Sequence, residues 1–103
     1  MNTEQSKAEL ESLALTCKAL SHPARLAILQ TLAVRGSCIC GEIVDVMPLS
    51  QATVSQHLKI LKNAGLITGQ VEGQKSCYCI NTDTMGELRE KFGVLFGSLK
   101  ECC

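Results

Sequence analysis

The sequence predicts a mainly α-helical protein with one β-hairpin, in the element order ααααββα. Three observations support this fold class. The chain has 103 residues, enough for a single domain (1–103) with a small core. Apolar residues recur at helical spacing over most of its length, and the spacing becomes alternating between about residues 66 and 81. No apolar run approaches the roughly 20 residues that a membrane span needs.

The first two helices are expected on either side of the segment 21–23. The first spans residues 4–20 and carries an apolar stripe: Leu10, Leu13, Ala14, Cys17 and Leu20. The first helix is predicted to end, and a second helix to begin, at the segment Ser21, His22 and Pro23, because proline suits the first position of a helix. The second helix is expected from Pro23 to about Val34, and Gly36 ends it.

Two short helices follow, joined by a tight turn at residues 48–50. The first is expected from about Cys40 to Met47, where Pro48 closes it. Ser50 is suited to cap the second, which spans residues 51–63. Val54, Leu58 and Leu61 share one narrow arc of this helix and are expected in the core. The pair predicts a helix-turn-helix.

The alternating segments 66–71 and 76–81 flank a glycine-bearing turn and predict a hairpin beside it, which makes a winged helix-turn-helix. Tyr78 and Ile80 are expected to face the core, and Cys77 and Cys79 to face outward. A last helix, capped by Thr82 or Asp83, runs to the end of the chain. The apolar stripes of segments 4–20 and 83–101 predict dimerisation helices, although the two could equally pack on each other.

The exposed arc of helix 51–63 has the character of a surface that enters the major groove of DNA. Glutamine can bond adenine edges, serine and threonine can contact bases or phosphates, and lysine can contact phosphates. Small side chains permit close approach, whereas an ordinary solvated face would favour Glu and Lys. With the hairpin tip, the predicted DNA-binding residues are Gln51, Ala52, Thr53, Ser55, Gln56, Lys59, Gln74 and Lys75.

The net charge of the chain and its expected cellular compartment exclude some classes of function. Lys+Arg and Asp+Glu number 10 each, so the chain has no net charge and is not a polybasic nucleic-acid binder. Residues 48–80 nevertheless carry three lysines against one glutamate. The polar N-terminus lacks the apolar core of a signal peptide, which indicates a cytoplasmic protein with no membrane partner.

Seven cysteines are many for so short a chain. Their odd number, the absence of an export signal and the helical patterning argue against a disulfide framework. Six of them form close pairs: Cys38 and Cys40, Cys77 and Cys79, Cys102 and Cys103. In a reducing compartment, close thiols favour a soft metal ion or redox chemistry.

Three segments together resemble the ArsR/SmtB family of metalloregulatory winged-helix repressors, in its arsenic-responsive branch. They are ALSHPARLAILQTLA, SCICGEIVDVMPLSQATVSQHLKILKNAGLI and the hairpin ending in YCIN, and they cover roughly residues 13–82. The resemblance implies a homodimer built on the first and last helices. It also implies binding to a pseudo-palindromic operator and release of DNA when a metal or metalloid binds. Gln51, Ala52, Ser55 and Gln56 match positions that approach DNA bases.

The resemblance also implies an inducer site. Cys38 and Cys40 fall where the arsenic-responsive branch carries CxCxxC, with Ile43 in place of the third cysteine. Trivalent arsenic or antimony is typically bound by three thiolates. At a helix start, residues two apart point about 200° away from each other, so shared binding would unwind the first turn. Cys102 and Cys103 rank second, with a third thiol from Cys17 or a partner chain, and the pair at 77 and 79 ranks third.

Alternative functions remain open. Zinc is less favoured because only His22 and His57 accompany the cysteines, but an all-cysteine zinc, cadmium or lead site fits the sequence. A thiol redox or persulfide-sensing repressor would keep the same fold. A small cytosolic metal-buffering thiol protein would leave helix 51–63 unexplained. An enzyme is not expected, because the histidines suit capping or packing and no nucleophile–base set is present.

Overall fold

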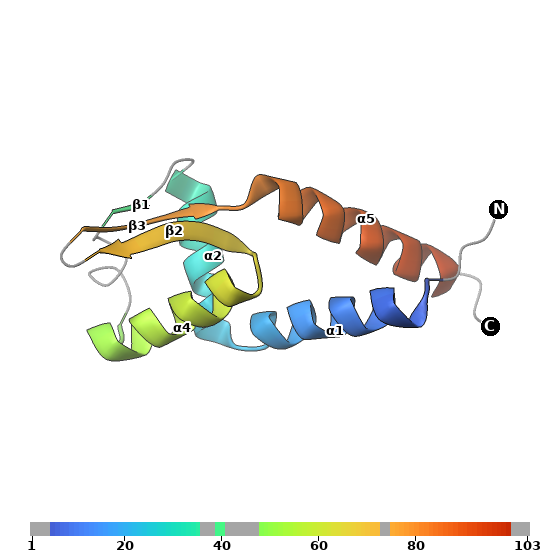
Figure 1. The fold of residues 1–103 in the computed structure, drawn as a ribbon, viewed down its shortest axis with the longest axis horizontal. Helices are drawn as coiled ribbons and strands as arrows, with labels where there is room; N and C mark the ends of the chain where they lie inside the picture. The colour runs from blue at the N-terminus through green and yellow to red at the C-terminus, as the bar shows by residue number, and fades with distance from the viewer. Residues whose placement is uncertain (1–4, 36–38, 41–47, 73–74, 100–103) are drawn as a thin grey trace.

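The computed structural model describes residues 5–35, 39–40, 48–72 and 75–99. Its elements are α1 (Lys7–Leu20), α2 (Pro23–Arg35), β1 (Ile39–Cys40), α4 (Gln51–Asn63), β2 (Ile67–Glu72), β3 (Lys75–Ile80) and α5 (Thr82–Leu99). The molecule is elongated, with extents of 50 × 23 × 23 Å. Figure 1 shows α2, α4 and the sheet gathered at one end, which we call the head. From it α1 and α5, which we call the arm, extend toward the two termini.

The sheet has three strands in the order β1-β3-β2, with both pairs antiparallel. β2 and β3 form the expected hairpin. β1 was not expected, and it corrects the prediction of a helix from about Cys40, because Cys40 lies in this strand opposite Cys77. The rest of that predicted helix, residues 41–47, lies outside the described residues. Local apolar spacing does not report a pairing between residues almost 40 positions apart, which is why the strand escaped prediction.

The helix boundaries follow local hydrogen bonds. α1 begins at Lys7, later than expected, because Ser6 Oγ accepts a hydrogen bond from the Glu9 amide at 3.1 Å. α2 begins at Pro23 as predicted, and His22 Nδ1 accepts from the Ala24 amide at 3.0 Å. α5 is capped by Asn81, whose Oδ1 accepts from the Thr84 amide at 3.2 Å. The predicted caps at positions 82 and 83 are therefore wrong.

One hydrophobic cluster forms the core of the head. The predicted inner arc of α4 is confirmed, since its three apolar side chains are at most 2% exposed. α5 has no buried residue, and only its first turns pack against the cluster. The core residues are Ala19, Ile28, Leu32, Val54, Leu58, Leu61, Leu66, Ile67 and Tyr78.

Within the described residues, no helix is long and apolar enough to cross a membrane.

Candidate nucleic-acid interface and thiol sites

α4 begins with a side-chain cap that uses one of the predicted DNA-binding residues. Ser50 Oγ accepts a hydrogen bond from the Thr53 amide at 3.3 Å, and it lies 2.9 Å from Thr53 Oγ1. The Thr53 hydroxyl thus has a partner within the protein and is half-buried. The other predicted positions of α4 are exposed, as a groove-facing surface requires: Gln51, Ala52, Ser55, Gln56 and Lys59.

The other end of α4 is closed by a glycine in the left-handed region. Gly65 has φ 78°, its amide donates to the Lys62 carbonyl at 2.9 Å, and the Leu66 amide donates to the Leu61 carbonyl at 3.1 Å. This is the Schellman arrangement, in which the two flanking leucines also meet in the core. It fixes where the chain leaves α4 and enters the hairpin.

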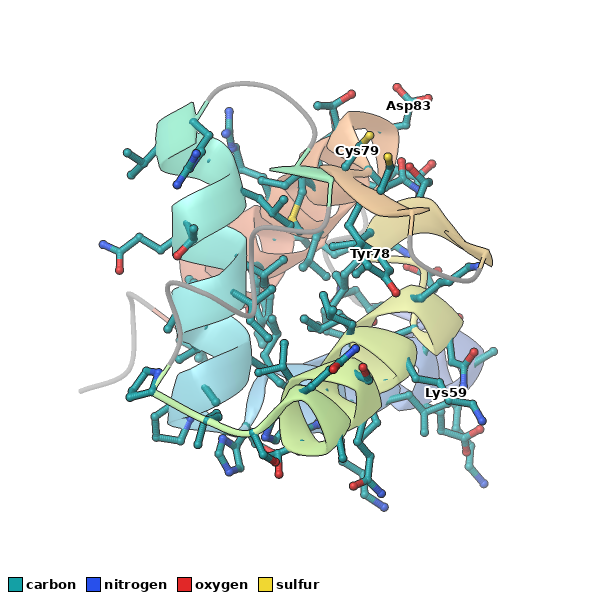
Figure 2. The ribbon with its side chains drawn as sticks, turned by 90° about the vertical axis from the view of Figure 1, so that its left-hand side faces the viewer. Lys59, Tyr78, Cys79 and Asp83 are labelled. Atoms are coloured by element: carbon teal, nitrogen blue, oxygen red, sulfur yellow. The ribbon has the colours of Figure 1, made fainter. Side chains whose placement is uncertain are left out.

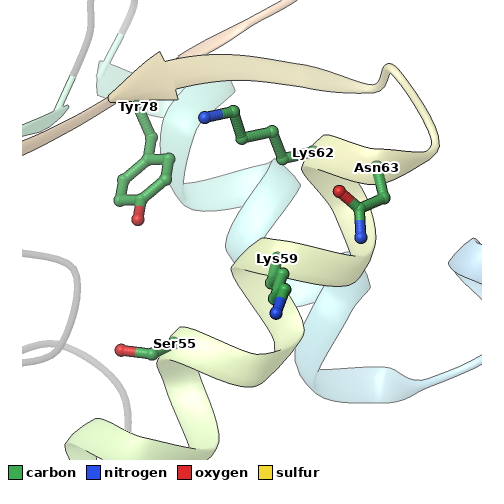
Figure 3. Close-up of a pocket in the computed structure, with 5 residues that line it drawn as sticks. All are labelled: Ser55, Lys59, Lys62, Asn63 and Tyr78. Carbon is green, nitrogen blue, oxygen red and sulfur yellow. The ribbon is translucent and has the colours of Figure 1, made fainter. Parts of the chain in front are cut away.

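A pocket of about 390 Å³ separates α4 from the wing strand β3. Figure 3 shows Tyr78 projecting from β3 toward α4, with Ser55, Lys59, Lys62 and Asn63 along the helix. Tyr78 is only 5% exposed, so its ring belongs to the core while it also lines the pocket. The position of Tyr78 in the core was predicted from the sequence, whereas its place beside the lysines was not. The alternation of β3 predicts that the Tyr78 side chain points inward, but it does not predict which residues that side chain meets.

Asn81 joins three elements. Its Nδ2 donates to the Gly65 carbonyl at 3.1 Å, and its backbone amide donates to the Leu66 carbonyl at 3.1 Å. With its cap at Thr84, it connects the end of α4, the end of β3 and the start of α5. No role for Asn81 could be predicted from the sequence.

His57 is half-buried on α4, in agreement with the packing role predicted for it. Its ring centroid is 4.4 Å from that of His22, and among the described residues its buried Nδ1 has no hydrogen-bond partner. Burial lowers the pKa of His57 below its usual value, and the nearby His22 and Arg25 lower that pKa further. The position is that of a neutral packing residue.

The predicted DNA-binding residues at the hairpin tip are not tested by the structure. Gln74 lies outside the described residues, and Lys75 is described only as the first residue of β3.

The cysteines of the predicted inducer sites are mostly outside the described residues. Cys38, Cys102 and Cys103 all lie there, and Cys40 is described only as a residue of β1. Cys17, offered as a third thiol, is exposed and free. Among the residues that the structure describes, no three metal-binding side chains converge.

β3 carries the pair that sequence analysis ranked last. Cys77 and Cys79 are both disulfide-bonded and half-buried, which corrects the expectation that they are free thiols. Figure 2 shows Tyr78 directed toward α4 and Cys79 on the opposite side of the strand, as strand alternation requires. Spacing along the sequence argued against a disulfide framework, but the sheet places cysteines of distant segments opposite each other, as at Cys40 and Cys77.

The strand at Cys40 also changes the predicted mechanism. Release by unwinding requires Cys40 at a helix start, whereas Cys40 lies in β1. Its predicted co-ligand Cys38 lies outside the described residues.

A head with an exposed polar helix beside a hairpin defines a winged helix-turn-helix DNA-binding protein. A family model described as a helix-turn-helix domain matches residues 20–70. The arsenical resistance operon repressor of Bacillus subtilis is 37% identical over 90 residues, covering 84% of this chain and 85% of that protein. An uncharacterised HTH-type regulator of Methanocaldococcus jannaschii is 42% identical over 79 residues, covering 76% and 88%.

The solution structure of a homodimeric winged helix-turn-helix domain from Mycobacterium bovis, a possible ArsR-family regulator, is similar in fold. It matches with a TM-score of 0.66 at 30% identity, covering 93% of this chain and 92% of that one. The chain belongs to the ArsR/SmtB family of transcriptional repressors. Its relatives are DNA-binding regulators rather than enzymes.

Proposed function

We propose that this protein is a homodimeric, cytoplasmic repressor that binds a pseudo-palindromic operator and releases it when trivalent arsenic or antimony binds cysteine thiolates. The observation that carries the DNA-binding part is the exposed face of α4. Its N-terminal half bears only short or amide side chains, and Lys59 and Lys62 follow beside the wing. The proposed DNA contacts are Gln51, Ala52, Thr53, Ser55, Gln56, Lys59, Gln74 and Lys75.

Two substitutions on α4 test the roles of its exposed face. Gln56→Ala should relax sequence preference by about 1–3 kcal/mol at one base pair, because a bidentate base contact is lost. Lys59→Ala should weaken binding to all sequences and reduce the slope of log affinity against log salt by about 0.9, the value of one phosphate contact. Lys7→Ala, on α1, is the matched control. An unchanged sequence preference in Gln56→Ala would contradict the assignment of the groove-facing arc.

The exposed apolar side chains of the arm support dimerisation through segments 4–20 and 83–101. Leu15 is 68% exposed and Phe96 60%, and the Phe92 and Phe96 rings stack with centroids 5.6 Å apart. Exposed apolar surface of this kind is typical of an interface. The remaining large apolar side chains exposed on the arm are Leu10, Val94 and Leu99.

Sedimentation at micromolar concentration tests the dimer. The wild-type chain should sediment as a dimer, and Phe96→Asp should shift it toward monomer because it places a charge in the apolar face. Lys7→Asp, an exposed change on α1, should leave the dimer intact. A wild-type monomer would remove the basis for binding two half-sites.

The proposed inducer ligands are Cys38 and Cys40, with Cys102 and Cys103 as the competing site. A close relative is an arsenical resistance repressor, and thiolates suit soft ions. Cys38→Ser and Cys40→Ser should each keep operator binding and lose release by arsenite, because serine is nearly isosteric but a poor soft-metal ligand. Cys17→Ser is the control. If Cys102→Ser/Cys103→Ser is blind to arsenite while Cys38→Ser responds normally, the sensor lies at the C-terminal pair.

A redox-sensing repressor is the second candidate, favoured by the disulfide-bonded state of Cys77 and Cys79. In that case hydrogen peroxide would release the operator by oxidising two thiols to a disulfide, with formation of two water molecules. A parallel titration of the operator complex with peroxide and arsenite distinguishes the two functions.

A further inference from the structure

The pocket between α4 and β3 contains a nearly buried tyrosine hydroxyl. Its volume of about 390 Å³ lies within the range of small-molecule sites, roughly 300–1,000 Å³. Tyr78 is only 5% exposed, yet its hydroxyl has no hydrogen-bond partner among the residues that the structure describes. Figure 3 shows this side chain directed toward α4 with its oxygen foremost. Because buried polar groups are normally paired, a hydroxyl placed in this way favours a ligand in the pocket.

The helix side of the pocket is positively charged. Lys59 and Lys62 line it, and neither lysine forms an ion pair with a described residue. α4 carries no acidic residue anywhere between Gln51 and Asn63. Ser55 contributes a hydroxyl and Asn63 an amide, and both can donate hydrogen bonds. Two unpaired cations and several donors around one cavity are suited to an anion.

The surfaces between these polar groups are apolar. The Tyr78 ring forms one wall of the pocket, and the aliphatic stems of Lys59 and Lys62 contribute to the opposite wall. An aromatic ring can stack on the Tyr78 ring, and its face can also attract an ammonium group. The pocket therefore fits an anion that has a flat aromatic body.

We propose that this pocket binds a small aromatic carboxylate and that the bound carboxylate excludes DNA from α4. The carboxylate accepts hydrogen bonds from the Tyr78 hydroxyl and from the ammonium group of Lys62. Ser55 and Lys59 line the pocket and are also proposed DNA contacts, so that one occupant blocks the other. The exclusion of DNA rests on the proposed function, whereas binding in the pocket does not.

The carboxylate 2-naphthoate and its neutral counterpart 2-naphthamide test the site. Tyr78 is the only tyrosine of the chain, so incorporation of 3-fluorotyrosine gives a single fluorine resonance at the pocket. This resonance distinguishes binding in the pocket from binding to the exposed apolar side chains of the arm. It should shift with a dissociation constant of about 1 mM or tighter for 2-naphthoate. The neutral amide should bind at least about 10-fold more weakly, because its hydrogen bonds are not charge-assisted.

Two substitutions remove one polar group each and keep the apolar wall. Tyr78→Phe removes the hydroxyl, and Lys62→Met removes the charge. Each should lower the calorimetric affinity for 2-naphthoate at least about 10-fold. Tyr78→Phe should keep the thermal unfolding midpoint of wild type, because its hydroxyl has no partner among the described residues. Lys7→Met, at the first residue of α1, is the matched control and should bind 2-naphthoate like wild type.

Competition with DNA from the protein's own promoter tests the exclusion. At ten times its dissociation constant and at constant ionic strength, 2-naphthoate should weaken DNA binding about 10-fold. Fluorescence anisotropy of labelled DNA measures this change, and Lys62→Met should show much less of it at the same 2-naphthoate concentration.

Four outcomes separate the parts of the inference. If the fluorine resonance does not move at about 1 mM 2-naphthoate, or if Tyr78→Phe and Lys62→Met bind it like wild type, the site is wrong. If 2-naphthoate and DNA bind together, the exclusion is wrong. If Tyr78→Phe binds DNA more weakly and 2-naphthoate has no effect, the pocket holds a DNA phosphate instead. A chain that binds 2-naphthoate at Tyr78 but no promoter DNA would support the site and contradict the proposed function.

Discussion

The head and the arm of this molecule are held together in different ways. In the head, α2, α4 and the sheet share side chains that are almost completely buried, such as Ile28 and Leu61, both 0% exposed. In the arm, α5 runs for 18 residues without one buried side chain, and several of its large apolar side chains are exposed. The head therefore has its own core, whereas the arm has an apolar surface that the proposed dimer would cover. Stability and association should consequently respond to mutation in different places.

The largest expected effect is on the free energy of unfolding, and it should differ between a leucine of the head and a leucine of the arm. Leu61→Ala should reduce the free energy of unfolding by about 2–5 kcal/mol, because it leaves a cavity in the head. Leu15→Ala on the arm, at 68% exposure, should change the stability of the monomer by less than about 0.5 kcal/mol. Urea unfolding at several protein concentrations measures both, since dimer dissociation makes the midpoint concentration-dependent. Equal losses at low concentration would contradict the comparison.

A pair of glycines should give effects of opposite sign. Gly69→Ala should cost about 1–3 kcal/mol of unfolding free energy, because the added Cβ overlaps the Cys77 carbonyl oxygen. Gly93→Ala on α5 meets nothing within 4 Å and should stabilise the helix by about 0.5–1 kcal/mol. Thermal unfolding measures both. A destabilising Gly93→Ala would instead indicate that the partner chain packs closely at this position.

Asn81 allows a test of the junction between head and arm. Asn81→Ala should cost about 0.5–2 kcal/mol, the range for loss of a helix cap. Asn81→Asp keeps the oxygen that accepts from the Thr84 amide but removes the donor to the Gly65 carbonyl. Asn81→Asp therefore tests the hydrogen bond to the Gly65 carbonyl while the cap of α5 is kept, with a negative charge added at the start of that helix. If both variants unfold like wild type, the hydrogen bonds of Asn81 contribute nothing to this junction.

The smallest expected effect is the pH dependence from His57. Because its pKa is lowered in the folded state, the unfolded chain binds the proton first as the pH falls below about 6.5. Its full contribution to stability is present above that pH and is lost progressively toward the folded-state pKa. The midpoint of urea unfolding should therefore fall less steeply between pH 7 and 5, roughly the window of this pKa, in His57→Gln than in wild type. Parallel curves for the two proteins would contradict this role.

The parts of the fold that local chemistry determines could be predicted from the sequence. α4 has the bounds predicted for it, 51–63, with Ser50 as its cap, and its inner arc is buried as its spacing required. The exposed candidates on α4 follow from the same spacing. For these residues, the sequence features that determine the structure lie within one or two helical turns of the residue itself.

The parts that depend on distant segments could not be predicted. β1 exists only through its pairing with β3, and the role of Asn81 depends on where the end of α4 lies in space. The cysteines show the same difficulty, because a close pair in sequence is obvious whereas a pair across two strands requires the register. The pocket position of Tyr78 likewise depends on the angle between α4 and the wing.

The three connections of Asn81 have a geometric consequence for a dimer. A dimeric helix-turn-helix protein that reads successive major grooves must hold its two reading helices one turn of DNA apart, about 34–36 Å. Here the end of α4 is bonded through Asn81 to the first turn of α5. Any rotation of α5 against a partner chain would therefore change the spacing of the two α4 helices. The residue would set which half-site separation the protein accepts, although it touches neither DNA nor inducer.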